Sequence, residues 1–108
     1  GLLESGEIDE AIKELQQAVK DPRKKTDAMF LLGRAFQLKD LPDLALGQYA
    51  KALVAAGSGV RANEALYEMG VICEGQGNKQ AALGHFTKII EQDIGFRDVA
   101  KKVEALKN

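Results

Sequence analysis

FLLGRAF (residues 30–36) and YEMGVIC (residues 67–73) share few identities but have the same order of small and large side chains. In each stretch a glycine follows a large apolar residue and precedes another apolar residue by three positions, so that Gly33 aligns with Gly70 at a shift of 37 residues. A recurring order of small and large residues indicates a recurring packing arrangement. The decisive feature of this chain is therefore an internal repeat.

A second recurring pattern follows each glycine stretch. ALGQYAKA (45–52) aligns with ALGHFTKI (82–89) at the same shift of 37, and AIKELQQA (11–18) aligns with the first of these at a shift of 34. The aligned small and large residues recur at i, i+4 and i+7, which is one face of an α-helix. The chain therefore contains three copies of one helix and two complete copies of the helix before it.

Turn and cap signals separate these helical stretches. Asp21-Pro22, Asp40-Leu41-Pro42 and GQGN (75–78) are typical of turns, with Asp40 and Asn78 as expected N-caps, and GSGVRA (57–62) indicates a longer flexible loop. We expect helices near 7–20, 24–39, 41–56, 61–75, 78–92 and 96–107, and no strand. This order predicts an all-α fold, an α-solenoid of stacked antiparallel helical hairpins.

The glycines predict close packing inside each hairpin. A Cβ at Gly33 or Gly70 would push the second helix away, and Ala45 and Ala82 are the expected small residues facing them. The large residues are expected to fill the space between successive hairpins; they are Phe36, Tyr49 and Phe86.

These residues resemble the signature of the tetratricopeptide repeat, a 34-residue helix–turn–helix unit. The matching positions are Leu32, Gly33, Phe36, Ala45, Tyr49 and Ala52 in one copy and Met69, Gly70, Cys73, Gly77, Ala82, Phe86 and Ile89 in the next. The resemblance implies a half repeat at 1–20, repeats at 24–56 and 61–92, and a capping helix at 96–107, where Glu104 replaces the glycine. It also implies that a first helix precedes Gly1, with Leu2 and Leu3 as its last residues, in a longer array.

Composition excludes several functional classes. The 108 residues carry a formal net charge of −1, which gives no overall attraction to nucleic acid or anionic lipid, and no apolar run is long enough to span a membrane. The single cysteine, Cys73, occupies a core position, and His85 is the only histidine, expected at a partly exposed edge. We find no catalytic, metal-binding or cofactor-binding motif and expect a protein that is not an enzyme and needs no cofactor.

The first helix of each hairpin carries a second row of residues, called the stripe below, beside the face that packs against the second helix. In the resembling family this stripe lines a concave groove that holds peptides, which makes its members the candidate binding residues: Asp27, Phe30, Leu31, Arg34, Gln37, Leu38, Glu64, Tyr67, Glu68, Val71, Glu74, Lys101 and Lys102. Arg34 and Tyr67 are the better anchors. The alternative for Phe30 and Leu31 is that they pack between adjacent first helices.

The charges of the stripe suggest the kind of partner. Asp98 joins four acids of the stripe (Asp27, Glu64, Glu68 and Glu74), and these face three bases, Arg34, Lys101 and Lys102. We therefore expect a protein or peptide partner with large apolar residues and some Lys or Arg, and no nucleic acid, because RNA needs a basic groove. The alternative function is a structural spacer or self-association segment without a ligand.

The N-terminal end suggests weak self-association. Without a preceding helix, the first expected helix should expose part of an apolar face containing Ile8, Ile12, Leu15 and Val19. Exposed apolar patches promote association. A weak homodimer through this end is therefore expected.

Overall fold

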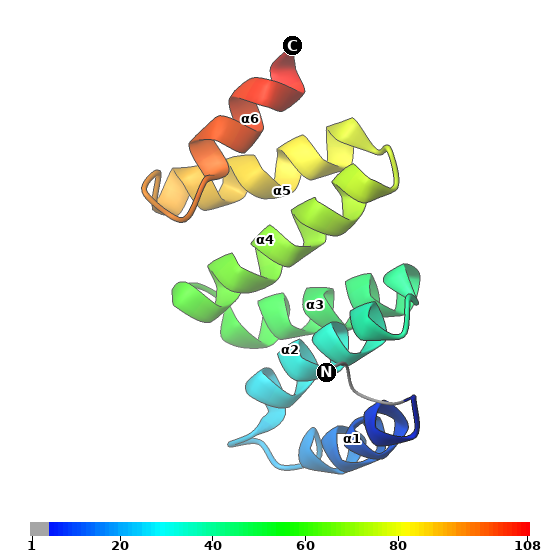
Figure 1. Ribbon diagram of the computed structural model, residues 1–108. Coiled ribbons are helices and arrows are strands. Elements are labelled where there is room, and N and C mark those ends of the chain that lie inside the picture. The colour runs from blue at the N-terminus through cyan, green and yellow to red at the C-terminus, as the bar shows by residue number, and fades with distance from the viewer. Residues whose placement is uncertain (1–4) are drawn as a thin grey trace.

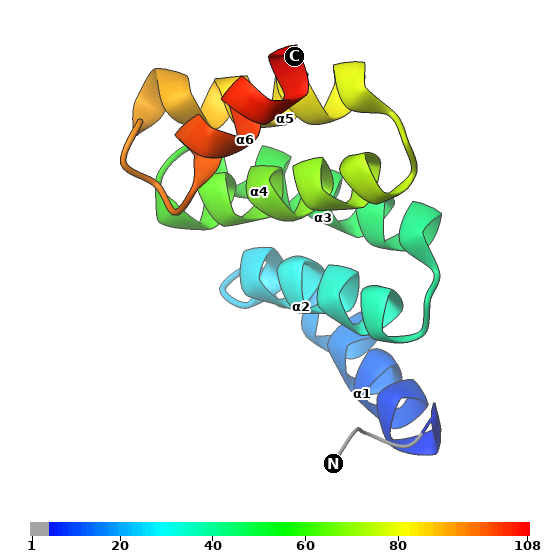
Figure 2. The same cartoon turned by 45° about the horizontal axis from the view of Figure 1, so that its top comes forward.

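The computed structural model describes residues 5–108, and these form six α-helices with no strand among them. The helices are α1 (Ser5–Ala18), α2 (Lys25–Leu38), α3 (Pro42–Ala56), α4 (Val60–Gly75), α5 (Lys79–Gln92) and α6 (Val99–Lys107). Each packs chiefly against the helix before and the helix after it, so that α1 and α6 lie at opposite ends of a stack (Figures 1 and 2). The expected all-α helical repeat is thus confirmed; the expectation for Leu2 and Leu3 lies outside the described residues.

The helix ends lie within two residues of expectation except for the start of α6, and the loop after α3 also differs from expectation. The loop after α3 contains only residues 57–59, because α4 already begins at Val60; the expected longer loop at 57–62 is wrong. Two glycines in left-handed conformations, Gly57 and Gly59, reverse the chain within this short space. The last helix begins at Val99 rather than 96, because Arg97 has a φ of 42°, which a right-handed helix cannot contain.

The turn inside each hairpin depends on one residue with positive φ. Asp40 has a φ of 59° between α2 and α3, and Gly77, at the equivalent position one repeat later, has a φ of 79° between α4 and α5. Aspartate tolerates this region better than most residues. Asp40 is therefore the turn residue and not the expected N-cap of α3, a position taken by Leu41. Asn78 is confirmed as the N-cap of α5, where its side chain accepts a hydrogen bond from the backbone N–H of Ala81.

Gly33 and Gly70 each lie under an aromatic ring of the following helix. A Cβ built on Gly33 would lie 2.7 Å from the ring of Tyr49, and one on Gly70 would lie 2.6 Å from the ring of Phe86. The expected close approach is confirmed, but the facing groups are these rings and not Ala45 or Ala82. Both rings are fully buried, and each also belongs to a core cluster that includes the next helix along the stack: Tyr49 with Ala65 and Met69 of α4, and Phe86 with Val99 and Val103 of α6.

The N-terminal helix buries more than expected. Ile8 and Ile12 are buried and pack in one cluster with Leu32 and Ala35 of α2, so they do not belong to an exposed apolar face. Leu15 is only half-buried. Because α2 covers the two isoleucines, the apolar surface left at this end is smaller than the sequence suggested.

Candidate protein-binding face

The candidate binding residues come from α2, α4 and the C-terminal α6, which lie in succession on one side of the stack with α3 and α5 behind them (Figure 2). We call this side the first-helix face. Packing within each hairpin positions this face. Gly33 and Gly70 each allow the first helix of a hairpin to lie directly against an aromatic ring of the helix that follows it. Neighbouring first helices are joined by side-chain contacts that cross from one repeat to the next.

Phe30 is not available to a ligand. Its side chain is 1% exposed and packs edge-to-face on Tyr49 with the ring centroids 5.3 Å apart. The guanidinium carbon of Arg61 lies 4.3 Å from the centroid of the Phe30 ring, and that of Arg34 lies 5.2 Å away. A cation over an aromatic face is attracted by the ring quadrupole. Phe30 is therefore a core residue of the α2–α4 junction, as in the alternative considered for it.

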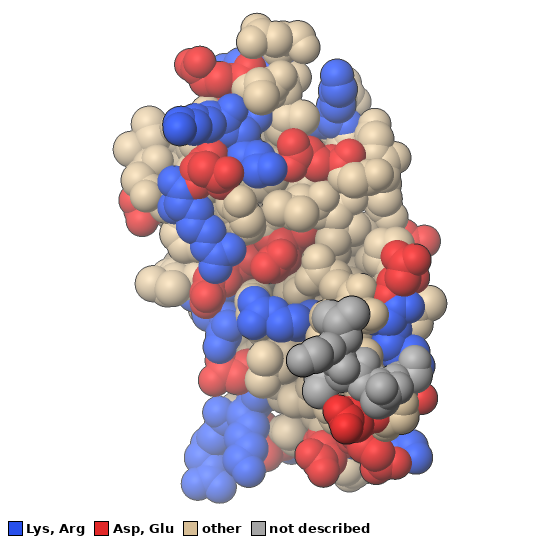
Figure 3. All heavy atoms as spheres, viewed as in Figure 1, with Lys and Arg blue, Asp and Glu red and all other residues tan. Residues whose placement is uncertain are grey.

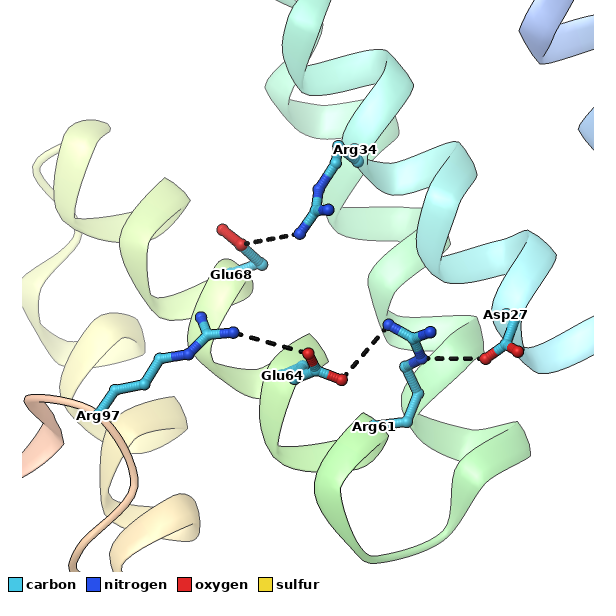
Figure 4. A network of polar contacts seen from close by, with 6 residues as sticks. All are labelled: Asp27, Arg34, Arg61, Glu64, Glu68 and Arg97. Carbon is cyan, nitrogen blue, oxygen red and sulfur yellow. Dashed lines mark hydrogen bonds and ion pairs between the residues drawn. The ribbon is translucent and has the colours of Figure 1, made fainter.

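A row of ion pairs runs along the first-helix face, and Figure 4 shows its three arginines, Arg34, Arg61 and Arg97. Arg61 donates to Asp27 at 3.0 Å, across from α4 to α2, and lies 3.3 Å from Glu64 on its own helix. Arg97, from the loop before α6, reaches the second oxygen of Glu64 at 3.7 Å. Glu64 thus stands between two guanidinium groups, so its charge is already matched within the chain.

Tyr67 is half-buried and repeats the arrangement of Phe30 one step along the stack. Its hydroxyl donates to Asp98 at 2.7 Å, and Arg97 lies over its ring at 4.8 Å from the centroid. The hydrogen bond lowers the pKa of the Asp98 carboxyl and raises the pKa of the Tyr67 phenol, because it stabilises ionised aspartate and protonated tyrosine together. The part of the ring that remains exposed is the aromatic surface this face offers.

The remaining charged candidates are also paired across helices. Lys102 donates to Glu74 at 2.9 Å, a contact that raises the pKa of the Lys102 ammonium group. Arg34 lies 3.9 Å from Glu68, at the outer limit for an ion pair. Lys101 is exposed. Apart from Lys101, the charges of this face therefore hold neighbouring helices together.

Three candidates on α2 lie away from the row of ion pairs. Gln37 accepts a hydrogen bond from the hydroxyl of Tyr49, a contact within the α2–α3 hairpin. Leu31 and Leu38 are 41% and 55% exposed and line a cavity between α1 and α2. The structure therefore brings Tyr67 and Val71 together with the paired charges but places these two leucines at a different surface.

Arg61 and Arg97 were missed by sequence reasoning, although both shape the first-helix face. With them the five acids meet five bases, so the expected acidic surplus is wrong; Figure 3 shows the two signs interleaved on the side it views. A signal was present in the spacing. Asp27 precedes Arg61 by 34 residues, the length of the repeat unit, and Arg34 precedes Glu68 by the same distance.

Reactive groups are few and isolated in the described part of the chain. Burial raises the pKa of the Cys73 thiol, which keeps it protonated and unreactive, and lowers the pKa of the partly exposed His85. Across residues 5–108 no three His, Cys, Asp or Glu side chains are grouped so as to hold a metal ion. None of the six helices is both long and apolar enough to cross a membrane.

The chain forms stacked helical hairpins that are joined along one side by ion pairs. Each complete hairpin has a glycine packed under an aromatic ring. These features define a helical-repeat protein of the solenoid class. A family model described as tetratricopeptide repeat matches residues 1–61 and again residues 42–95. The chain belongs to the tetratricopeptide repeat family, whose members are generally protein–protein interaction modules. No curated protein sequence matches this chain at a significant level of similarity.

Proposed function

We propose that the first-helix face binds a segment of a partner protein, helical or extended, which lies across α4 between its neighbours. The observation that carries this proposal is the partly exposed ring of Tyr67 beside half-buried Val71, an apolar strip in the middle of a polar face. Tyrosine is enriched among the residues that dominate binding energy at interfaces. Large apolar side chains of the ligand would contact this strip.

The surrounding ion pairs set the polar part of this interaction. The acids of this face already form ion pairs with cations of the chain. A basic ligand residue must replace one of these partners, so it contributes to binding only the difference in free energy between the new ion pair and the old one. Preference for a basic ligand therefore stays a prediction, and we expect a modest dependence of affinity on salt. The small number of repeats limits the contact area, so a transient complex with a micromolar dissociation constant is expected.

The spacer function has one observation in its favour. Pairs such as Arg61–Asp27 and Lys102–Glu74 satisfy the face from within, which is the behaviour expected where the stack only needs to hold its shape. The two functions differ in one respect, which is whether the Tyr67 strip contributes binding energy to another protein.

A peptide-library screen against the full chain tests the proposal. Tyr67→Ala should weaken selected peptides by about tenfold or more, corresponding to about 1.4 kcal/mol, whereas Tyr67→Phe keeps the ring and should stay within about threefold of the parent. Circular dichroism melts establish that both variants fold. Val54→Ala, on an exposed position of α3, is the control away from the face.

The result that supports the spacer function is equally clear. Peptides that bind the parent and the folded Tyr67→Ala variant with equal affinity do not use this face. A screen that returns no ligand for the parent gives the same answer. Either outcome would replace the proposed function with the spacer function.

A further inference from the structure

Phe30 and Tyr67 are equivalent ring positions on successive first helices, separated by the shift of 37 residues that relates the two repeats. Each ring packs edge-to-face on an aromatic ring of the following helix, with the centroids 5.3 Å apart for Phe30 and Tyr49 and 5.6 Å apart for Tyr67 and Phe86. An arginine from further along the chain lies over each ring. The two positions are therefore built alike up to the arginine.

The arginine over Phe30 is held by short contacts. Arg61 belongs to α4 and lies 3.0 Å from Asp27 and 3.3 Å from Glu64. Its guanidinium carbon is 4.3 Å from the centroid of the Phe30 ring, which is buried. The ring at this position is therefore fully occupied by contacts within the chain.

The arginine over Tyr67 is held by longer contacts. Arg97 comes from the loop before α6 and lies 3.7 Å from Glu64, as Figure 4 shows, and its guanidinium carbon is 4.8 Å from the centroid of the Tyr67 ring. Its side chain is exposed, and its φ of 42° places a residue other than glycine in the left-handed region, which strains the backbone. Arg97 is therefore bound more weakly at its ring than Arg61 is at the equivalent ring.

Three groups around Tyr67 suit a guanidinium ion. They are the aromatic ring, the carboxylate of Glu64 and the carboxylate of Asp98, which accepts the Tyr67 hydroxyl at 2.7 Å. A carboxylate that accepts one hydrogen bond can accept others. The planar guanidinium can stack on the ring while its N–H groups donate to carboxylates, whereas the compact ammonium group of lysine lacks this geometry. The site therefore favours arginine over lysine.

We propose that Tyr67, Glu64 and Asp98 form a binding site for an arginine side chain of the partner segment, which replaces Arg97. This inference rests on the function proposed above and specifies its ligand, an arginine beside an apolar residue that contacts Val71. A ligand arginine is not tied to the strained loop, so it can approach the ring and Glu64 as closely as Arg61 approaches its own partners. Arg97 then turns into solvent at little cost, because its ion pair is long and its side chain exposed.

Arg97→Gly is the variant that tests this site. Glycine adopts a positive φ without strain, so the loop before α6 keeps its conformation while the guanidinium group is removed. Arg23→Ala is the matched control, because it also removes one positive charge and its side chain is 90% exposed in the loop between α1 and α2. Circular dichroism melts establish that both variants fold.

A peptide library screened against Arg97→Gly should return sequences enriched in arginine over lysine. Selected peptides should bind Arg97→Gly about fivefold or more tightly than they bind the parent or Arg23→Ala, as measured by fluorescence anisotropy. Replacing the arginine of the peptide by citrulline, which is neutral and has nearly the same shape, should remove this difference. The proposal is overturned if arginine is not enriched, if the difference survives citrulline, or if folded Arg97→Gly binds no more tightly than the parent.

The Tyr67→Ala variant separates failure of this inference from failure of the proposed function. Peptides that lose affinity for Tyr67→Ala but bind Arg97→Gly and the parent equally use the Tyr67 strip without an arginine site. Peptides whose affinity neither substitution changes bind elsewhere, and then both proposals fail.

Discussion

The repeat formed by α2 and α3 and the repeat formed by α4 and α5 differ more at their surfaces than in their interiors. Both place a glycine under an aromatic ring, and a Cβ built on the glycine would lie at nearly the same distance from that ring, 2.7 Å at Gly33 and 2.6 Å at Gly70. Both also carry an aromatic residue three positions before that glycine, with an arginine from the next repeat over its ring. The side chains that complete this contact come from different structural positions in the two repeats.

The difference lies in how the arginine arrives. Arg61 belongs to the first turns of α4 and covers a ring that is fully buried, Phe30. Arg97 belongs to a loop, has a left-handed backbone and covers a ring that stays half-exposed, Tyr67. The interior thus requires one residue type at one position, whereas the face requires only that some cation reach the ring. That is why the interior repeats and the face varies.

The largest test of this comparison concerns the two glycines. Gly33→Leu and Gly70→Leu should each destabilise the chain by about 3 kcal/mol or more, because a side chain at either position must displace a buried ring. Denaturant unfolding followed by circular dichroism measures the loss. Similar losses at both sites would show that the interiors are equivalent.

Two other helical glycines provide the matched controls. Gly47 on α3 and Gly84 on α5 have no atom within 4 Å of a built Cβ. Leucine at these positions should be neutral or should stabilise by up to about 1 kcal/mol, since glycine is a poor helix former. If Gly33→Leu changes the free energy of unfolding no more than Gly47→Leu does, the close contact at Gly33 does not hold the hairpin together.

A smaller and unequal effect is expected from the two arginines. Arg61→Ala should cost about 1–2 kcal/mol because it removes two ion pairs and uncovers Phe30, whereas Arg97→Ala should cost about 0.5 kcal/mol at the more exposed ring. Arg61→Lys keeps the charge but loses the planar stacking and should fall between parent and alanine. Equal losses of unfolding free energy for Arg61→Ala and Arg97→Ala in chemical denaturation would show that the two arginine–ring contacts do not differ.

The smallest expected effect distinguishes Tyr49 from Phe86, the two residues whose rings cover the glycines. Burial raises the pKa of Tyr49 above its ordinary value of 10.0, whereas Phe86 cannot titrate. A raised pKa in the folded state means that the stability contribution is complete below about pH 10 and is lost as the pH rises further. Melting temperatures measured on either side of pH 10 should therefore fall less for Tyr49→Phe than for the parent. Parallel curves would show that Tyr49 does not ionise with unfolding.

The interior of this chain was predictable from sequence because steric constraints leave few options. A helix approaching within contact of a ring needs glycine, so Gly33 and Gly70 identified both hairpins. The contact partners were less predictable. Tyr49 and Phe86, one turn after the expected alanines, face the glycines because a helical side chain lies over the turn preceding its own Cα.

The first-helix face was harder to predict because its contacts join residues that are far apart in the sequence. Any side chain long enough to reach the neighbouring helix can make such a contact. Helical periodicity placed Phe30 on a surface stripe, but the ring is buried in a cluster with Tyr49 of α3 and Met69 of α4, and Arg61 covers it. Arg97 lies in a loop, outside any helical pattern, and reaches Glu64 only because its backbone adopts an unusual conformation. Periodicity within one helix carries no information about such contacts; charge pairs at the repeat length carry some.

The order of packing along the stack has a mechanical consequence. Each helix rests chiefly on its immediate neighbours in sequence, and α1 and α6 lie at opposite ends. A force that draws these ends apart acts on the junctions in series, so every junction bears the full force and the weakest junction opens first. Extension would then proceed by peeling single helices or hairpins in small steps, each of which can close again when the load is released. Under tension the stack is therefore expected to lengthen in steps, one helix or hairpin at a time.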